Sequence, residues 1–500
     1  MLQYRLQHTF PYADIEVINT GLTAINSFTL VDFAKAIVRE SPDAIIMYAG
    51  HNEYYGTLGV GSNSKLANAP WMVRTLLKAR DLRIVQFTLH LGQIFKGKAS
   101  KVDLSETLMQ RMAQDQRILY GSKKYTQGIK QFEDNLDLIL KQFNKKRIPV
   151  FLATLVSNLK DQPPMLASQQ TASHHDKNVL ASLVAQDTAK AIALLQKAIA
   201  ADETNAVNHY KLAQLLADRG HLTEARVHYV AAKEYDPLRF RAPEAINEII
   251  KKKVEKWDNV RLVDIQEIFN QKSEGGIPGN NLFLEHLHPN AHGYYQIAEA
   301  FACSLHDAKM IASEWPIATS HEGDFSDSET FWNKIPFTRV DSLYGLYQTW
   351  MLKEQWPFNQ PMPPAEDRDR TFEEKIAGGL SVKTIEWGEG MNAMYEHYLK
   401  SGDLDEAMKI TESLILEFPF DMRLYDRVGS LSEKIGNTER AFFYYKKAFD
   451  IQPSGKWAEK VFITGLKLDK SEEVVKYMEF AIKNNNGRWI LDHFWGWWQK

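Results

Sequence analysis

Four apolar-rich segments of strand length recur along the chain, at residues 15–20, 44–48, 148–155 and 260–265. Between and after them the apolar spacing changes to a helical period, over residues 28–40, 126–144 and 289–305. Strands that alternate with helices predict a parallel α/β sheet covered by helices on both faces. The sequence therefore indicates a domain of the α/β class.

A second pattern interrupts this alternation between the third and fourth predicted strands. From residue 186 to 237 the period stays helical and predicts two helical hairpins. Several positions match tetratricopeptide-repeat spacing, because small residues let paired helices approach closely, glycine turns the chain and proline ends the second helix. These positions are Leu212, Ala213, Gly220, Ala225, Tyr229, Ala232 and Pro237.

The same repeat returns near the C-terminus. Gly402, Ala407 and Pro419 are each followed 34 positions later by the same residue type, at Gly436, Ala441 and Pro453, and this is the period of the tetratricopeptide repeat. A less regular unit at 457–481 is expected to cap the stack. The tryptophans between 489 and 498 are expected to cover its end.

These patterns divide the chain into five parts. The α/β domain is expected over residues 1–165 and 255–312, with the inserted hairpins over 177–240. A linker rich in Pro, Trp and Phe, residues 315–385, is predicted to wrap the α/β domain, and the C-terminal repeats are assigned to 386–500. The linker tryptophans Trp332, Trp350 and Trp356 are interpreted as packing residues, with a ligand groove as the alternative.

Composition narrows the classes of function. The chain has 500 residues, too many for a single core. A net charge of −3 and the lack of a basic, aromatic stripe argue against a nucleic-acid partner. The single cysteine, Cys303, excludes an internal disulfide and is expected to be a buried thiol. No apolar run reaches the ~18–20 residues that a membrane span requires.

Residues able to take part in catalysis come directly after the predicted strands, at the end of the sheet where open α/β folds bind ligands. Gly21 lets a backbone N–H approach a ligand, and Asn52 offers an amide donor of the kind that stabilises an oxyanion. After the last strand, His288 precedes Pro289, a favoured first residue of a helix. Glu285 lies three residues earlier and is able to orient the His288 ring, as the acid of a catalytic triad does.

The order of these blocks resembles the SGNH (GDSL-type) hydrolase family. Gly21 matches the second block of that family, Gly50-His51-Asn52-Glu53 the third, and Glu285-His286-Leu287-His288-Pro289 the last. Glu53 and Glu285 stand where the family carries Asp. The resemblance implies a flavodoxin-like three-layer fold, His288 as base, Glu285 as its orienting acid, and Gly21 and Asn52 as oxyanion donors.

The resemblance also implies a nucleophilic serine on a strand ahead of the helix at residues 2–10, which the chain does not contain. Ser27 follows the glycine block and lies in the wrong place for that role. The chain is therefore expected to be an inactive piece of an esterase that needs no cofactor and acts on an acyl ester such as a lipid or sugar acetate. Export or membrane anchoring through a missing N-terminus is suspected from the resemblance.

Two other interpretations stay open. The chain is a non-catalytic scaffold if its repeats only bind a protein or peptide partner. It is a metal hydrolase if His286, His288 and His292 bind zinc, since two histidines four apart on a helix can share a metal. A second cluster, His174-His175-Asp176, is expected to be solvated.

Overall fold

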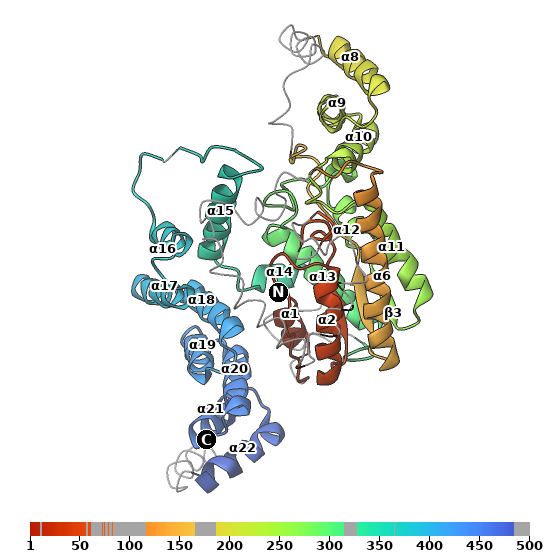
Figure 1. Cartoon of the computed structure of the whole chain (residues 1–500). Coiled ribbons are helices and arrows are strands. Elements are labelled where there is room, and N and C mark those ends of the chain that lie inside the picture. Colours follow the sequence, from red (N-terminus) through yellow and green to blue (C-terminus); the bar gives the residue numbers. More distant parts are fainter. Residues whose placement is uncertain are drawn as a thin grey trace. The chain divides into compact units, whose positions relative to one another are not determined.

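The structure is a computed structural model that describes residues 1–10, 13–56, 59–61, 117–165, 187–314, 328–364 and 366–484, together with positions 73, 75, 79 and 83. The chain divides into two compact units. Unit 1 comprises residues 1–2, 16–314 and 349–363, and unit 2 comprises residues 3–15, 315–348 and 364–500. Helices make up most of the described part of both units (Figure 1).

Unit 1 contains a small parallel sheet. Its strands are β1 (Ile45–Met47), β2 (Val150–Ala153) and β3 (Val260–Val263), and β2 pairs with both of the others. Every residue of β2 is buried, as expected of a central strand covered on both faces. Three of the four predicted strands therefore form, each shorter than the apolar run that indicated it.

Helices pack on both faces of this sheet. On one face lie α2 (Ser27–Ile37), the short 3-10 helix η1 (Val38–Glu40), α6 (Lys123–Lys145) and α11 (Glu244–Lys256). Val150 and Leu152 belong to the core that these helices form with the sheet. Alternate strand residues point to opposite faces, so Phe151 points to the side where α13 (Ala291–Asp307) contacts β2 and β3. Helix α12 (Ile265–Gln271) packs against α13.

The prediction of a strand at residues 15–20 is wrong. Residues 14–22 have no regular secondary structure, and Ile18 is 70% exposed. An extended segment persists as a strand only when a neighbouring strand takes its hydrogen bonds. Among the described residues, β1 pairs with β2 alone, so no neighbouring strand takes the hydrogen bonds of residues 15–20. Their apolar content was therefore not sufficient to form a strand. Gly21 lies in the same irregular segment.

The described part of the inserted segment, from residue 187 on, contains three helices. These are α8 (Thr188–Ala201), α9 (Ala206–Asp218) and α10 (Leu222–Tyr235), and α9 and α10 are the pair that packs closely. Ala213 and Ala225 are fully buried within this pair. Gly220 turns the chain with φ of 80°, a conformation that glycine adopts without strain. The His174-His175-Asp176 cluster lies outside the described residues.

The predicted linker is more regular than its sequence suggested. It contains α14 (Ser328–Lys334), α15 (Arg339–Glu354) and α16 (Phe372–Ser381). Val340, Ile376 and Leu380 share a core with residues of the C-terminal repeats, so these segments are helical because their apolar faces have a partner. Trp332 and Trp350 lie on α14 and α15, while Trp356 packs edge-on against Phe240 at a centroid distance of 6.2 Å.

Three helical hairpins end the described part of the chain. Their helices are α17 (Trp387–Ser401), α18 (Leu404–Glu417), α19 (Met422–Lys434), α20 (Thr438–Ile451), α21 (Gly455–Lys467) and α22 (Ser471–Asn484). Gly402 and Gly436 both have φ of 80° after the first helix of a hairpin, and Ala407 and Ala441 are fully buried on the second. The tryptophans between 489 and 498 lie outside the described residues.

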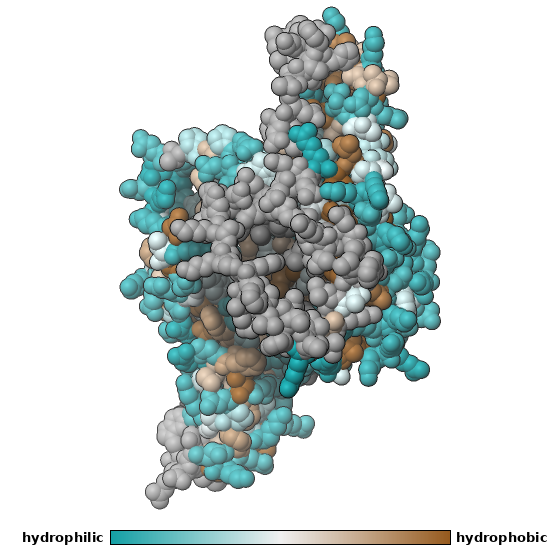
Figure 2. All heavy atoms as spheres, in the orientation of Figure 1, coloured by the Kyte–Doolittle hydropathy of each residue, from teal (hydrophilic) through white to brown (hydrophobic). Residues whose placement is uncertain are grey.

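Figure 2 shows mostly hydrophilic side chains on the described surface that faces the viewer, with smaller hydrophobic patches between them. Within the described ranges, no helix combines the length and the apolar character needed to cross a bilayer. Cys303 on α13 is half-buried, not fully buried as expected, and its Sγ lies 3.6 Å from Glu299 Oε1.

Candidate functional site

The turn before α13 holds the acid and base that the sequence analysis singled out. The buried Glu285 carboxylate accepts hydrogen bonds from the backbone N–H groups of His286 (2.6 Å) and His288 (2.8 Å). A further short hydrogen bond joins Glu285 Oε1 to His288 Nδ1. The backbone of Leu284 donates to the His288 carbonyl over 2.9 Å and closes the turn. Glu285 thus fixes the orientation of the His288 ring.

The His288 ring is partly open to solvent, with its side chain 57% exposed, whereas Glu285 is almost completely covered. Withdrawal of part of the ring from water lowers the pKa of His288. With Nδ1 held by Glu285, Nε2 is the ring atom that can take up a proton.

His286 has a different environment from its neighbour. Its ring is buried, lies 5.3 Å from the Phe358 ring between centroids and contacts the Glu285 carboxylate through Nδ1. Burial lowers the pKa of His286 well below its usual range, and nearby cationic groups add to the effect. His286 is therefore a neutral packing residue, and His288 is the histidine suited to proton transfer.

The segment after β1 (Ile45–Met47) carries, at its third position, a glycine that the packing requires. Gly50 has φ of 154°, and a Cβ at this position would lie 2.6 Å from Leu155 Cδ1. The chain passes close to the segment after β2 at this point and then carries His51 and Asn52. Asn52 is half-buried, and its carbonyl accepts from Gly56 N over 2.7 Å.

The two predicted oxyanion donors are not joined to the His288 site. Gly21 is exposed, and its N–H already donates to Asn19 Oδ1 over 2.9 Å. Across the described residues, no hydrogen bond links Gly21 or Asn52 to Glu285 or His288. Their role as oxyanion donors stays a prediction.

Glu53, which stands where the resembled family has Asp, is a structural residue in this chain. Its carboxylate accepts from Ser27 N (3.1 Å), Ser27 Oγ (2.7 Å) and Gln131 Nε2 (2.5 Å) at the start of α2. Burial raises the pKa of Glu53 to about 7, although these hydrogen bonds oppose the shift. Ser27 is buried and also accepts from Asn135, so its hydroxyl is engaged and unsuited to a nucleophilic role.

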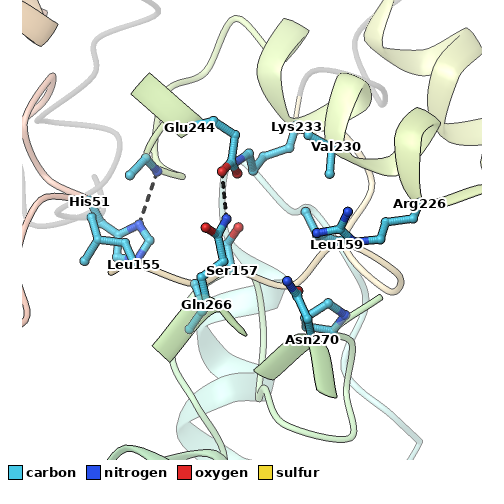
Figure 3. A pocket seen from close by; sticks show the side chains of 13 residues that line it. His51, Leu155, Ser157, Leu159, Arg226, Val230, Lys233, Glu244, Gln266 and Asn270 are labelled. Atoms are coloured by element: carbon cyan, nitrogen blue, oxygen red, sulfur yellow. Dashed lines mark hydrogen bonds and ion pairs between the residues drawn. The ribbon is translucent and has the colours of Figure 1, made fainter. Parts of the chain in front are cut away.

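The sequence indicated no role for His51, but its side chain lines a pocket at the carboxyl ends of β2 and β3 (Figure 3). His51 Nδ1 accepts from the backbone N–H of Ala242 over 3.2 Å, which leaves the ring proton on Nε2. Burial lowers the pKa of His51 to about 3, with smaller contributions from Lys233 and His288. His51 is thus a neutral donor at neutral pH, and only its position after an apolar run marked it in the sequence.

The described residues contain no group of three or more His, Cys, Asp or Glu side chains able to hold a metal ion. His288 lies in the turn, whereas α13 begins at Ala291 after the Asn290 N-cap. Pro289 is therefore not the first helical residue, and His288 and His292 do not share a helical register. The geometry gives the metal alternative no support.

A second candidate site lies on the first helices of the C-terminal hairpins. Asn392 on α17 accepts from Arg427 Nη1 on α19 over 2.9 Å. Asp426 on α19 accepts from Lys456 (3.1 Å) and Lys460 (2.5 Å) on α21. These five residues, called the polar ladder below, join three successive first helices and show that these helices share one face of the stack.

Aromatic rings lie beneath the cations of the polar ladder. The Arg427 guanidinium is 4.7 Å from the Tyr395 ring centroid, and the Lys456 and Lys460 ammonium groups are 4.2 Å from Trp457 and 4.4 Å from Tyr445. Burial works against ionisation of Asp426, but hydrogen bonds from the two lysines lower its pKa. The ladder therefore carries three cations and one anion.

The second helices of these hairpins already have a partner within unit 2. Helix α1 (Leu2–Thr9) places the His8 ring 5.0 Å from the Phe443 ring of α20, between centroids, and His8 Nε2 lies 3.4 Å from Tyr444 Oη. Tyr444 in turn donates to Glu412 on α18 over 2.5 Å. Burial lowers the pKa of His8 to about 4. An amphipathic helix from outside the repeats thus packs on this stack.

Comparison with known proteins supports one of the C-terminal repeats. A family model described as tetratricopeptide repeat matches residues 423–454, which span α19 and α20. This hairpin is similar to a tetratricopeptide repeat. No curated protein matches the chain. The match supports a predicted repeat at residues 423–454 and does not test the others, whereas the resemblance to SGNH hydrolases finds no support in these comparisons and stays a prediction.

Proposed function

We propose that the chain is a protein-binding scaffold whose C-terminal repeats take a partner on the face that carries the polar ladder. The observation that supports this most is the continuity of the ladder over α17, α19 and α21. Stacked helical repeats bind partners along such extended surfaces. Helix α1 covers part of the second helices of the hairpins. A partner therefore reaches charged groups, those of the polar ladder, on the first helices.

The chemistry of the ladder suggests the kind of partner. Arg427, Lys456 and Lys460 outnumber the one carboxylate, Asp426. Cations over aromatic rings keep part of their charge available to an approaching anion. An extended or helical protein segment with several acidic residues fits this face best, and its binding should weaken as salt screens the charges.

The experiment compares two substitutions on one helix. Fluorescence anisotropy measures binding of labelled acidic peptides to the full chain, to Arg427→Glu and to Lys434→Glu, which makes the same charge change at an exposed position of α19. We expect Arg427→Glu to weaken binding by about tenfold or more, since a reversed charge at an interface costs a few kcal/mol. Equal weakening by both substitutions would contradict the proposal, because it would indicate only a general charge effect.

A second function is favoured by a separate observation, the Glu285–His288 pair. We propose that the α/β part, residues 1–165 and 255–312, belongs to an SGNH-type ester hydrolase in which His288 is the base and Glu285 its orienting acid. A buried carboxylate fixed on Nδ1 of a solvent-accessible imidazole is the arrangement that a serine nucleophile requires of its base. Asn52 and Gly21 are the proposed oxyanion donors, and an acyl ester the proposed substrate.

The test of this second function uses short-chain aryl esters and a longer chain extended upstream of residue 1. His288→Ala and Glu285→Gln should each lower turnover by roughly 10³-fold or more if the pair acts in a triad. His292→Ala, on the neighbouring helix, is the matched control and should retain activity. Activity that survives His288→Ala would refute the assignment.

A further inference from the structure

A pocket separate from the polar ladder lies in unit 1, between the inserted hairpin and the sheet (Figure 3). Its walls come from the segments after β1 and β2, helix α12 after β3, helix α10 of the insert, the start of α11, and Pro278. Figure 3 shows Arg226 and His51 on opposite sides, with Glu244 and Lys233 along one wall and Gln266 and Asn270 along another. Ligands of open α/β sheets bind at this end of the strands.

The charges around the pocket cancel. Lys233 is buried and forms ion pairs with Glu234 (3.2 Å) and Glu244. Burial disfavours both ions, but their mutual attraction keeps the pKa of Lys233 raised and that of Glu244 lowered. Arg226 also contributes to the lowered pKa of Glu244. The lining therefore holds two cations, Arg226 and Lys233, and one carboxylate, Glu244. The Glu234 carboxylate lies outside the lining but pairs with Lys233, so that the two carboxylates together balance the two cations.

Neutral polar groups line the same space. Ser157 Oγ and the Asn270 side-chain amide make no hydrogen bond to any described residue. Gln266 Nε2 donates to Glu244 Oε2 over 2.7 Å, and Arg226 donates through Nε to the Gly276 carbonyl over 3.0 Å, which leaves its two terminal nitrogens as donors. Donors and acceptors therefore face the cavity together.

Apolar side chains occupy the wall between these polar groups, notably Leu155, Val230 and Pro278. The cavity measures about 210 Å³. For comparison, a cavity of roughly 150 Å³ holds a benzene molecule. The space thus suits a six-membered ring that carries several substituents, with hydroxyl groups toward the polar walls and C–H groups toward the apolar one.

We propose that this pocket binds a neutral sugar, either a free hexose or the terminal hexose of a glycan. The cancelled charges, the mixture of donors and acceptors and the ring-sized volume all fit a polyhydroxylated neutral molecule and none fits an ion. The proposal does not depend on a protein partner at the repeats or on ester hydrolysis.

The experiment titrates the full chain with neutral hexoses, their methyl glycosides, and matched uronic acids and amino sugars, by isothermal calorimetry and by saturation-transfer NMR. We expect saturable binding of at least one neutral hexose or its glycoside, and binding about tenfold or more weaker for the charged analogues. A preference for the methyl glycoside identifies a glycan end as the ligand, and equal binding identifies the free sugar.

Two substitutions and one control test whether the sugar binds in this pocket. Ser157→Ala and Asn270→Ala each remove one hydrogen-bonding group and should weaken binding about tenfold. Gln271→Ala, which removes an exposed amide from the same helix as Asn270, should leave binding unchanged. Thermal unfolding checks that all three variants fold. The proposal is overturned if no neutral sugar binds, if a charged analogue binds better, or if Ser157→Ala and Asn270→Ala bind as tightly as the unchanged chain.

Discussion

Glu53→Gln isolates the energetic effect of one buried carboxyl group. In the folded chain burial raises the pKa of Glu53 to about 7, compared with 4.5 for an unperturbed glutamate. The folded state therefore binds the proton more tightly than the unfolded state. Stability from this group is fully present below about pH 4.5 and is lost as the pH rises through 7. At ~1.4 kcal/mol per pKa unit, the loss amounts to about 3 kcal/mol.

The glutamine variant cannot ionise, so it should not show this loss. It can keep the acceptor oxygen that serves Ser27 Oγ and Gln131, but its NH₂ group would face the Ser27 N–H, at a cost of about 1 kcal/mol for one lost hydrogen bond. We therefore expect Glu53→Gln to be slightly less stable than the unchanged chain at pH 5 and about 2 kcal/mol more stable at pH 8.

Hydrogen exchange of the α2 amides, followed by mass spectrometry and corrected for the intrinsic exchange rate at each pH, measures this difference within the local structure. Between pH 5 and 8 the opening constant of the unchanged chain should rise by on the order of a hundredfold relative to the variant. Glu40→Gln, at an exposed position after the same helix, should show no such difference. Equal pH dependence in the chain and in Glu53→Gln would refute the reasoning.

Three further predictions concern backbone strain and burial. Gly50→Ala should lower the melting temperature of unit 1, with a cost of about 1–3 kcal/mol, because its Cβ would lie 2.6 Å from Leu155 Cδ1; calorimetry checks this. Gly436→Ala should destabilise the repeats by about 1 kcal/mol, because the backbone at this position has φ of 80°. Gly345→Ala should instead stabilise unit 2, because a Cβ at this position of α15 has open space and alanine favours a helix more than glycine does. Urea unfolding measures both changes. Acidification from pH 6.5 to 4 should loosen α1 by up to about 3 kcal/mol, because burial lowers the pKa of His8 to about 4, and His8→Phe should abolish this loss in hydrogen exchange of residues 3–10.

Local patterns predicted the elements whose stability depends on nearby residues. The apolar runs at β1, β2 and β3 and the 34-residue spacing of the repeats were sufficient, since each is a property of a short segment. The strand predicted at 15–20 failed because strand formation depends on a partner, which composition does not report. The helices between 328 and 381 were missed because their apolar faces meet the repeat core, far along the sequence.

In the candidate site, too, a role could be predicted only where the interacting residues lie close together in the sequence. Glu285 and His288 are three residues apart, so a motif could pair them. The role of Glu53 could not be predicted, because its partners Ser27 and Gln131 are 26 and 78 positions away. The Arg226 and Lys233 side chains reach the pocket only because an insert folds back on the sheet, an arrangement that no local pattern encodes.

The spacing of the three strands has a consequence for the order in which the chain folds. β1 and β2, and again β2 and β3, lie on the order of a hundred residues apart, so each pairing must close a loop at an entropic cost of about 4 kcal/mol. The hairpins need only local contacts and should form on a faster timescale. Helices α8, α9 and α10 lie within the second loop. If they fold first, they shorten the flexible chain between β2 and β3, so the insert assists the assembly of the sheet that it interrupts.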